Sequence, residues 1–204
     1  MQFSSRLIED AVNAFAGLPG IGPKTALRLV LHLVQRPTED SVQLAQAIAK
    51  MRQNIQHCIT CGNLSDQNVC SICRDARRDK SIICVVESIR DVMAIEETQQ
   101  YRGVYHVLGG VISPIEGVSP SDIAIELLLS RVSDPESEVK EILLALSATM
   151  EGDTTAFFIT KKLKPYNLKI TTIARGVPIG SELEYADEIT LGRSIVGRKI
   201  YEEG

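Results

Sequence analysis

Four of the five cysteines in this 204-residue chain are spaced as metal ligands. They form the pairs CITC and CSIC, separated by eight residues, and are Cys58, Cys61, Cys70 and Cys73. Four thiolates at this spacing bind a tetrahedral Zn²⁺ at about 2.3 Å and leave no position for water. A reduced cluster without metal is the alternative, but so short and polar a segment has little core to hold it. We therefore predict one structural zinc per chain.

Two nearby residues are not expected to take part in this chemistry. His57 precedes the first ligand, but a fifth ligand is not needed, so we expect it at the surface. Cys84 lies in the apolar run IICVVE, where a buried thiol behaves as a small hydrophobic side chain. The four-cysteine set is therefore expected to be complete.

A turn containing Gly20 and Gly22 lies in the segment LPGIGPKTALRL, between two amphipathic stretches. These glycines permit a sharp turn, and the helix that follows presents unpaired N–H groups to an anion. Lys24 and Arg28 lie one turn apart on one face of that helix, within reach of a phosphodiester backbone. We predict DNA binding without sequence preference, to single or double strands. A plain helical hairpin with capping glycines is the alternative.

Three acidic residues follow two of the apolar runs in the second part of the chain. Glu87 ends the run IICVVE, and Glu151 and Asp153 follow the run VKEILLAL. The carboxyl ends of parallel strands meet at one edge of a sheet, so these carboxylates are expected to converge, and carboxylates are ligands for Mg²⁺. The plainer interpretation is that they cap helices and complement helix dipoles.

The elements that hold these residues change in character along the chain. Helical spacing predicts three helices, at residues 5 to 15 with Ser4 or Ser5 as N-cap, at 23 to 35 and at 39 to 56. After residue 80, Val/Ile/Leu runs alternate with amphipathic stretches, which predicts βαβ units and a sheet of about four parallel strands. The tail has one weak helix and is expected to pack on a neighbour.

Charge and hydropathy restrict the partners. The net charge is −4, but residues 1 to 80 hold 10 basic against 7 acidic residues, whereas residues 81 to 204 hold 12 against 19. Any nucleic acid is therefore expected to bind the N-terminal part. Mean hydropathy is +0.04, no apolar run is long enough to span a membrane, and the first residues do not resemble a signal peptide. We expect a cytoplasmic protein with no membrane partner.

The motifs, taken in order, resemble the RecR family of bacterial recombination mediators. The glycine turn, with Leu18, Ile21 and Ala26 beside it, resembles a helix-hairpin-helix motif, and VVES and TMEGDTT resemble the Toprim domain of topoisomerases, primases and some nucleases. YHVLGGVISPIEG, VESIRDVMAIEET and the tail GVPIGSELEYADEITLGRSIVGR extend the resemblance to nearly the whole chain. Ser147-Ala148 replace a usual Asn-Pro, and Asp153 replaces a commoner Glu, so metal or partner binding beside them stays open.

The resemblance implies an α+β fold made of several modules. We expect a helix-hairpin-helix DNA-binding region at residues 1–56 and a four-cysteine zinc finger at 57–76. A Toprim domain at 81–175 and a C-terminal assembly segment at 176–204 complete the chain. The resemblance also implies a homo-oligomer, either a dimer or a ring-like tetramer.

The resemblance further implies a non-catalytic role in recombinational repair of DNA damage. Such a protein clamps DNA and, with the partners RecO or RecF, helps to load RecA onto single strands covered by single-strand-binding protein. The acidic edge of Glu87, Glu151 and Asp153 would bind Mg²⁺ or a partner such as RecO.

Two other classes of function compete with this one. A topoisomerase needs a tyrosine nucleophile on a sizeable second domain and a primase needs template-holding parts, for which the chain has no room. A nuclease stays open through the acids, with His106 able to approach the same edge from its own strand. The third class is a zinc-stabilised interaction module in which DNA binding is incidental.

Overall fold

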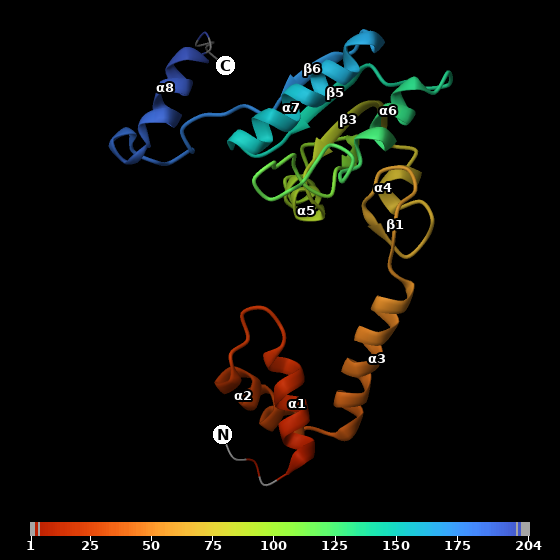
Figure 1. Cartoon of the computed structure of the whole chain (residues 1–204), viewed down its shortest axis with the longest axis vertical. Helices are drawn as coiled ribbons and strands as arrows, with labels where there is room; N and C mark the ends of the chain where they lie inside the picture. Colours follow the sequence, from red (N-terminus) through yellow and green to blue (C-terminus); the bar gives the residue numbers. More distant parts are fainter. Residues whose placement is uncertain (1–2, 4, 199, 201–204) are drawn as a thin grey trace. The chain divides into compact units, whose positions relative to one another are not determined.

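The computed structural model describes residues 3, 5–198 and 200 and divides the chain into two compact units, at residues 1–55 and 56–204 (Figure 1). The first unit is helical, and its elements are α1 (Arg6–Ala16), α2 (Pro23–Val34) and α3 (Thr38–Asn54). Among the described helices, none has the length and apolarity needed to span a lipid bilayer.

The hairpin of α1 and α2 is held by a small apolar core. Val12 of α1 packs against Ala26 and Val30 of α2, and Ala26 is fully buried. A small side chain there lets the helices approach closely. Ser5 is the N-cap of α1 in extended backbone, although its side chain makes no capping hydrogen bond, while Ser4 lies outside the described residues.

The third helix differs in two ways from its predicted form. It ends at Asn54 rather than at residue 56, because Gln56 already pairs in a strand. Its apolar side chains also lie exposed, and none of its residues is buried in the described structure. The predicted amphipathic pattern is therefore present, but within this single chain it faces no core.

The second unit contains a small cysteine-rich module and a larger α/β module. The first comprises β1 (Gln56–His57), β2 (Leu64–Ser65) and α4 (Ser71–Arg74). The second comprises β3 (Asp79–Val86), α5 (Ile89–Glu97), β4 (Gly103–Val107), α6 (Ile125–Ser133), β5 (Glu141–Ala145), α7 (Met150–Leu163), η1 (Lys164–Tyr166) and β6 (Lys169–Thr172). The tail follows with η2 (Leu183–Tyr185) and α8 (Glu188–Val196).

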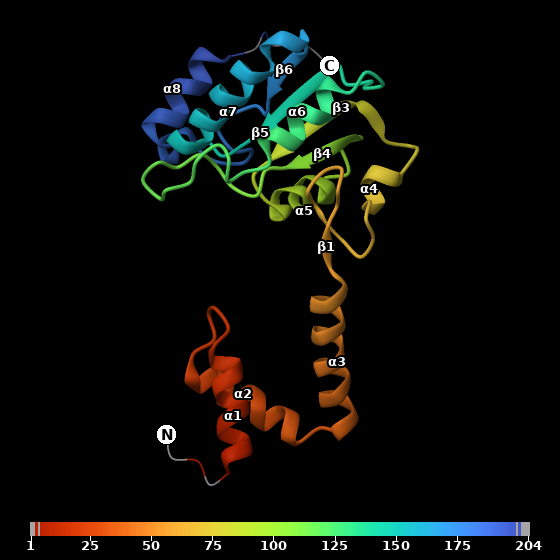
Figure 2. The same ribbon diagram turned by 45° about the vertical axis from the view of Figure 1, so that its right-hand side comes forward.

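The four strands of the α/β module form one parallel sheet in the order β4-β3-β5-β6, as predicted. Alternate residues of β3 face opposite sides, because side chains have a period of two along a strand. Ile83 and Val85 pack in the cluster that includes residues of α6 and α7, whereas Cys84 and Val86 pack with α5. Figure 1 and Figure 2 show these helices on the two faces of the sheet.

Candidate zinc, DNA and acidic sites

The four predicted metal ligands come together in the cysteine-rich module. The sulfur atoms of Cys58, Cys61, Cys70 and Cys73 all lie within 4.8 Å of one another. The Cys61 and Cys70 sulfurs are 3.6 Å apart. A tetrahedral zinc with Zn–S bonds of about 2.3 Å separates its sulfurs by about 3.8 Å. The cluster therefore has the dimensions of a closed tetrathiolate site.

Backbone N–H groups also point at these sulfurs, as thiolate ligands require. The N–H of Cys70 donates to Cys58 Sγ at 3.3 Å, and that of Cys73 donates to Cys70 Sγ at 3.5 Å. A hydrogen bond with Cys73 lowers the pKa of Cys61 to about 5, whereas burial raises the pKa of Cys70. Four thiolates so close together repel one another, and a divalent cation offsets that repulsion.

His57 is exposed and Cys84 is buried, as we expected from the sequence. His57 is exposed, and its Nδ1 lies 3.0 Å from the carbonyl oxygen of Gly62. Cys84 is fully buried in β3, and burial raises the pKa of its thiol to about 12. A thiol with so high a pKa stays protonated and inert at neutral pH.

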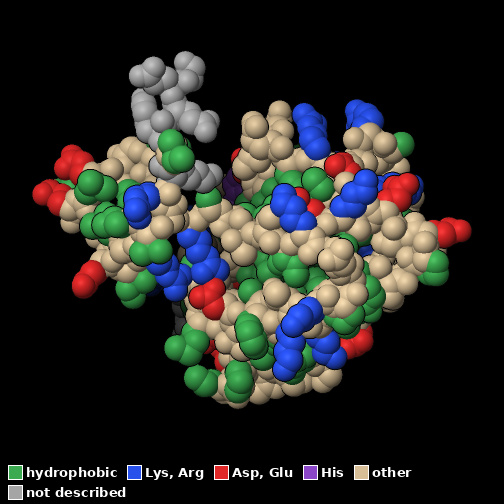
Figure 3. All heavy atoms as spheres, turned by 90° about the horizontal axis from the view of Figure 1, so that it is seen from above, with side chains coloured by type: hydrophobic (Ala, Val, Ile, Leu, Met, Phe, Trp, Pro, Cys, Tyr) green, Lys and Arg blue, Asp and Glu red, His purple; other side chains and the backbone are tan. Residues whose placement is uncertain are grey.

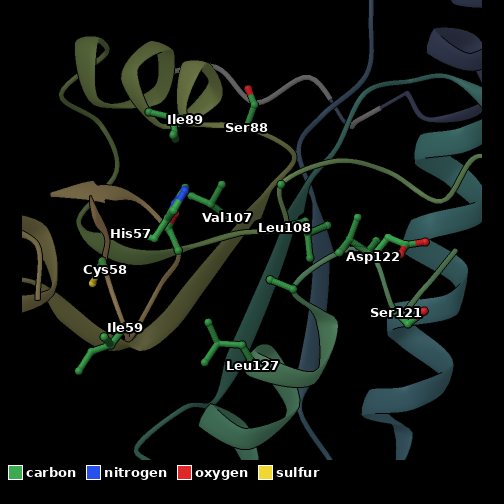
Figure 4. Close-up of a pocket in the computed structure, with 14 residues that line it drawn as sticks. His57, Cys58, Ile59, Ser88, Ile89, Val107, Leu108, Ser121, Asp122 and Leu127 are labelled. Carbon is green, nitrogen blue, oxygen red and sulfur yellow. The ribbon is translucent and has the colours of Figure 1, made fainter. Parts of the chain in front are cut away.

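The first cysteine pair lies directly against β4. The N–H of Val107 donates to the carbonyl oxygen of Cys61 at 2.7 Å. Gly62 has φ +76°, and a Cβ there would lie 2.9 Å from the Val107 carbonyl oxygen. Figure 4 shows His57 and Cys58 beside Val107, around a cavity of about 720 Å³ between the two modules. The close approach and the positive φ both require glycine at 62.

The predicted DNA-contact residues lie at the start of α2. Gly20 has φ +79°, and Gly22 is the extended N-cap of α2, with no acidic residue in the first turn of the helix. Lys24 and Arg28 are both exposed and line a groove of about 420 Å³. The positive end of the helix dipole and two cations therefore face solvent together, an arrangement that attracts phosphate.

The histidine of this groove was not singled out from the sequence. His32 lines the same groove and follows Arg28 by one helical turn. The i, i+4 spacing from Arg28 is the signal that could have found it.

The three predicted acids do not form one cluster. Glu87 follows β3, and its Oε1 accepts hydrogen bonds of 2.6 Å from both the N–H and the hydroxyl of Ser147. Asp153 lies in the first turn of α7 and forms ion pairs with Arg175 at 2.7 Å and Arg193 at 3.7 Å. Among the described residues, only the four cysteines group three or more ligand atoms within 4.8 Å. No three carboxylates therefore form a ready-made ligand set among these residues, and the Mg²⁺ site stays a prediction.

Glu151 also lies in the first turn of α7, beyond the loop that follows β5, rather than at the end of the strand itself. Its position fits the plainer interpretation of an acid that complements a helix dipole.

His106, which the sequence left able to approach the acidic edge, makes its contacts elsewhere. Its ring is fully buried in β4, with Nε2 2.7 Å from the Ala124 carbonyl oxygen and Nδ1 3.3 Å from Arg131 Nη1. Side chains alternate along a strand, and that of residue 106 faces α6.

The whole chain aligns with curated bacterial proteins named Recombination protein RecR. It is 58% identical to the protein of Cytophaga hutchinsonii over 99% of this chain and 98% of the relative. Identity is 57% with the Flavobacterium johnsoniae protein, over 100% and 98%, and 56% with the Bacteroides thetaiotaomicron protein, over 98% and 97%. The chain belongs to the RecR family.

Family models match the successive parts of this RecR-family chain. The RecR helix-hairpin-helix model matches residues 8–52, the RecR model of a four-cysteine zinc finger domain matches 55–75, the Toprim domain model matches 81–174 and the RecR C-terminal model matches 176–199. The zinc-finger match contains all four clustered cysteines. Sequence, geometry and family thus agree on a four-cysteine zinc finger.

Proposed function

We propose that the chain is a non-catalytic DNA-binding mediator of recombinational repair in the bacterial cytoplasm. In this role it clamps DNA and, with RecO or RecF, helps to load RecA onto strands covered by single-strand-binding protein. The observation that carries the proposal is the near full-length similarity to proteins named Recombination protein RecR, together with the exposed cations at the start of α2.

The hairpin supplies the DNA contact. Lys24 projects from the first turn of α2, where the dipole is positive, and Arg28 follows one turn later. The glycine turn lets the phosphate backbone approach. Contacts of this kind go to phosphates and not to base edges, so binding carries little sequence preference. They also explain how a chain with a net charge of −4 can hold DNA through one local surface.

The acidic edge of Glu87, Glu151 and Asp153 is proposed to bind Mg²⁺ or a partner, and the contacts of Asp153 favour a partner. Glu151 and Asp153 occupy the first turn of α7, and Asp153 already accepts arginine side chains. A basic surface of RecO fits the same chemistry, in which arginine guanidinium groups pair with carboxylates.

A nuclease or another strand-processing enzyme is the second candidate, and the site favours it less. Its acids would need to hold Mg²⁺ while a separate group activates the nucleophile. Glu87 instead bonds to Ser147, and His106 is buried against α6.

Assembly into a dimer or ring-like tetramer accounts for the exposed apolar side chains at both ends of the chain. In the first unit these include Val34, Ile48 and Met51, and in the tail they include Ile189 and Val196. Figure 3 shows hydrophobic side chains gathered on the segment at the left that carries α8. Burying such surface between copies is favourable, so the N-terminal and C-terminal parts are each proposed to pair with their counterparts.

DNA binding is tested by fluorescence anisotropy with labelled single-stranded and double-stranded oligonucleotides. Lys24→Glu is expected to lower affinity at least tenfold, because it removes one phosphate contact and adds repulsion. Lys50→Glu, an equal charge change at an exposed position of α3, is the matched control and is expected to bind far better than Lys24→Glu. Equal affinity of the two variants would refute the hairpin assignment.

Catalysis is tested by incubating the pure protein with supercoiled and single-stranded DNA and Mg²⁺ or Mn²⁺. The mediator proposal expects no nicking, relaxation or nucleotide incorporation. Activity that disappears in Glu87→Ala would overturn the proposal in favour of an enzyme.

A further inference from the structure

The β4 edge of the Toprim sheet is contacted by the zinc finger and two arginines. β4 is the outer strand of the sheet, so one row of its backbone groups has no strand partner. Three groups of this row are nevertheless hydrogen-bonded: Gly103 O accepts from Arg78 Nη1 at 3.4 Å, Tyr105 O accepts from Arg131 Nη1 at 2.8 Å, and Val107 N donates to Cys61 O at 2.7 Å.

This row places Arg131 next to a zinc ligand. The carbonyl of one residue and the N–H of the second residue after it point to the same side of a strand. Tyr105 O, which binds Arg131, and Val107 N, which binds Cys61, are therefore neighbours on the open edge. Arg131 comes from α6, is partly buried, and contacts β4 through Tyr105 O and His106 Nδ1.

The charge of Arg131 is not neutralised by its immediate neighbours. Its other contact is Nδ1 of His106, which must be an unprotonated acceptor because a guanidinium can only donate. Within the described part of the chain, Arg131 forms no ion pair with a carboxylate. A partly buried cation of this kind is stabilised by a nearby negative charge.

The cysteine cluster supplies that negative charge. Zn²⁺ held by four thiolates has a net charge of −2. Burial lowers the pKa of Arg131, and the nearby Cys73, Cys61 and Cys58 thiolates act in the opposite direction and raise it. The opposite charges therefore stabilise one another across the joint between the two modules.

We propose that Arg131 is the counter-charge of the tetrathiolate zinc centre and so couples zinc retention to the edge of the Toprim sheet. It acts as a positioning residue outside the ligand set. The inference rests on zinc occupying the four cysteines, which metal analysis of the wild-type protein establishes before any variant is compared.

Arg78 offers a matched comparison on the same edge. It contacts Gly103 O as Arg131 contacts Tyr105 O, but its charge is paired with Glu96, whose Oε1 lies 2.8 Å from Arg78 Nη1. Loss of Arg78 therefore removes an edge contact without removing a charge partner of the zinc centre.

The test measures the rate at which a chromophoric chelator removes zinc from the full-length protein. Arg131→Gln keeps an N–H donor but loses the charge, whereas Arg131→Lys keeps the charge. The Gln variant is expected to release zinc 10- to 100-fold faster than wild type, the range typical of lost outer-shell partners. The Lys variant and Arg78→Met are expected to stay within about threefold of wild type. Equal rates for the Gln and Lys variants, or a wild-type rate for Gln, would overturn the proposal.

Far-UV circular dichroism checks that each variant is folded before release is measured. If Arg131→Gln does not fold with zinc in excess, Arg131→Lys is compared with wild type after Co²⁺ substitution. Because the Lys variant retains the positive charge, we expect its thiolate-to-cobalt absorption band to be unchanged and its metal release to stay within threefold of wild type. Release at least tenfold faster from the Lys variant would then refute the counter-charge role.

Discussion

His106 is held in its neutral form by the two hydrogen bonds of its ring. Arg131 can only donate to Nδ1, so the ring proton lies on Nε2 and is donated to the carbonyl oxygen of Ala124. Burial lowers the pKa of His106 to about 4, and the charge of Arg131 acts in the same direction. A histidine held in this way stabilises packing and is a poor general base at the acidic edge.

This environment predicts a pH dependence of stability. Unfolded histidine titrates near 6.5 and folded His106 near 4, so the unfolded state binds more protons between these values. Stability is therefore full above pH 6.5 and falls as the pH drops toward 4, by about 1.4 kcal/mol at pH 5.5. Urea unfolding with excess zinc at pH 8 and at pH 5.5 measures this difference in the free energy of unfolding. His106→Gln should remove about this part of the pH difference, and an unchanged difference would contradict the prediction.

At the scale of elements, the zinc finger is joined to the sheet by a backbone hydrogen bond and by apolar packing. Besides the hydrogen bond of Cys61 to Val107, Ile72 of α4 packs in the cluster of α5 and the sheet that contains Tyr105. The finger has almost no apolar core apart from its cysteines. Zinc binding therefore provides its folding free energy, and that energy also protects the sheet edge.

We predict that Cys58→Ser abolishes stoichiometric zinc and unfolds residues 57 to 76. Wild-type protein purified without chelator should carry one zinc per chain by elemental analysis. Hydrogen exchange should report faster exchange of the Val107 amide in the variant, because its acceptor is the Cys61 carbonyl. Zinc-free wild-type protein with a protected Val107 amide would be evidence against this coupling.

Gly62 gives a second prediction at this scale. Gly62→Ala must adopt a positive φ and also bring its Cβ to 2.9 Å from the Val107 carbonyl oxygen. Gly117 has a similar φ of +75° but nothing within 4 Å of its Cβ position, so Gly117→Ala introduces only the backbone strain. We expect a loss of about 1 kcal/mol for Gly117→Ala and about 1 to 3 kcal/mol more for Gly62→Ala in urea unfolding. Similar losses of unfolding free energy for the two variants would mean that the zinc finger accommodates the added Cβ without further loss of stability.

At the scale of the whole molecule, the helices of the first unit bury little of their apolar surface. Ile48 and Met51 of α3 are 54% and 55% exposed, and Val34 at the end of α2 is 65% exposed. Exposed apolar side chains grouped on one unit are typical of a surface that packs against another copy. This exposure supports the proposal that copies of the chain assemble and that the assembly binds DNA.

We predict that Ile48→Glu shifts the protein toward smaller species. A charge at this position opposes burial between copies, so the mass measured by light scattering after size exclusion should fall by half or more. Gln46→Glu, at an exposed polar position of the same helix, should leave the mass unchanged. An unchanged mass for Ile48→Glu would place the interface elsewhere.

The sequence by itself determined the features that depend on local spacing. The two C-x-x-C pairs specify a zinc ligand set, because each pair turns two sulfurs toward one point. The glycine turn specifies the hairpin, and alternating apolar runs specify the parallel sheet, because periodicity decides which side chains are buried. These predictions use residues close together in the chain.

Only the tertiary structure decided which distant side chains meet. It paired Asp153 with Arg175 and Arg193, where the sequence had grouped this acid with two others. It also placed Arg131, 58 residues after Cys73, on the strand edge that receives the zinc finger. Such pairings depend on strand order and on which face each residue occupies, and both are set by the packing of the whole sheet rather than by local spacing.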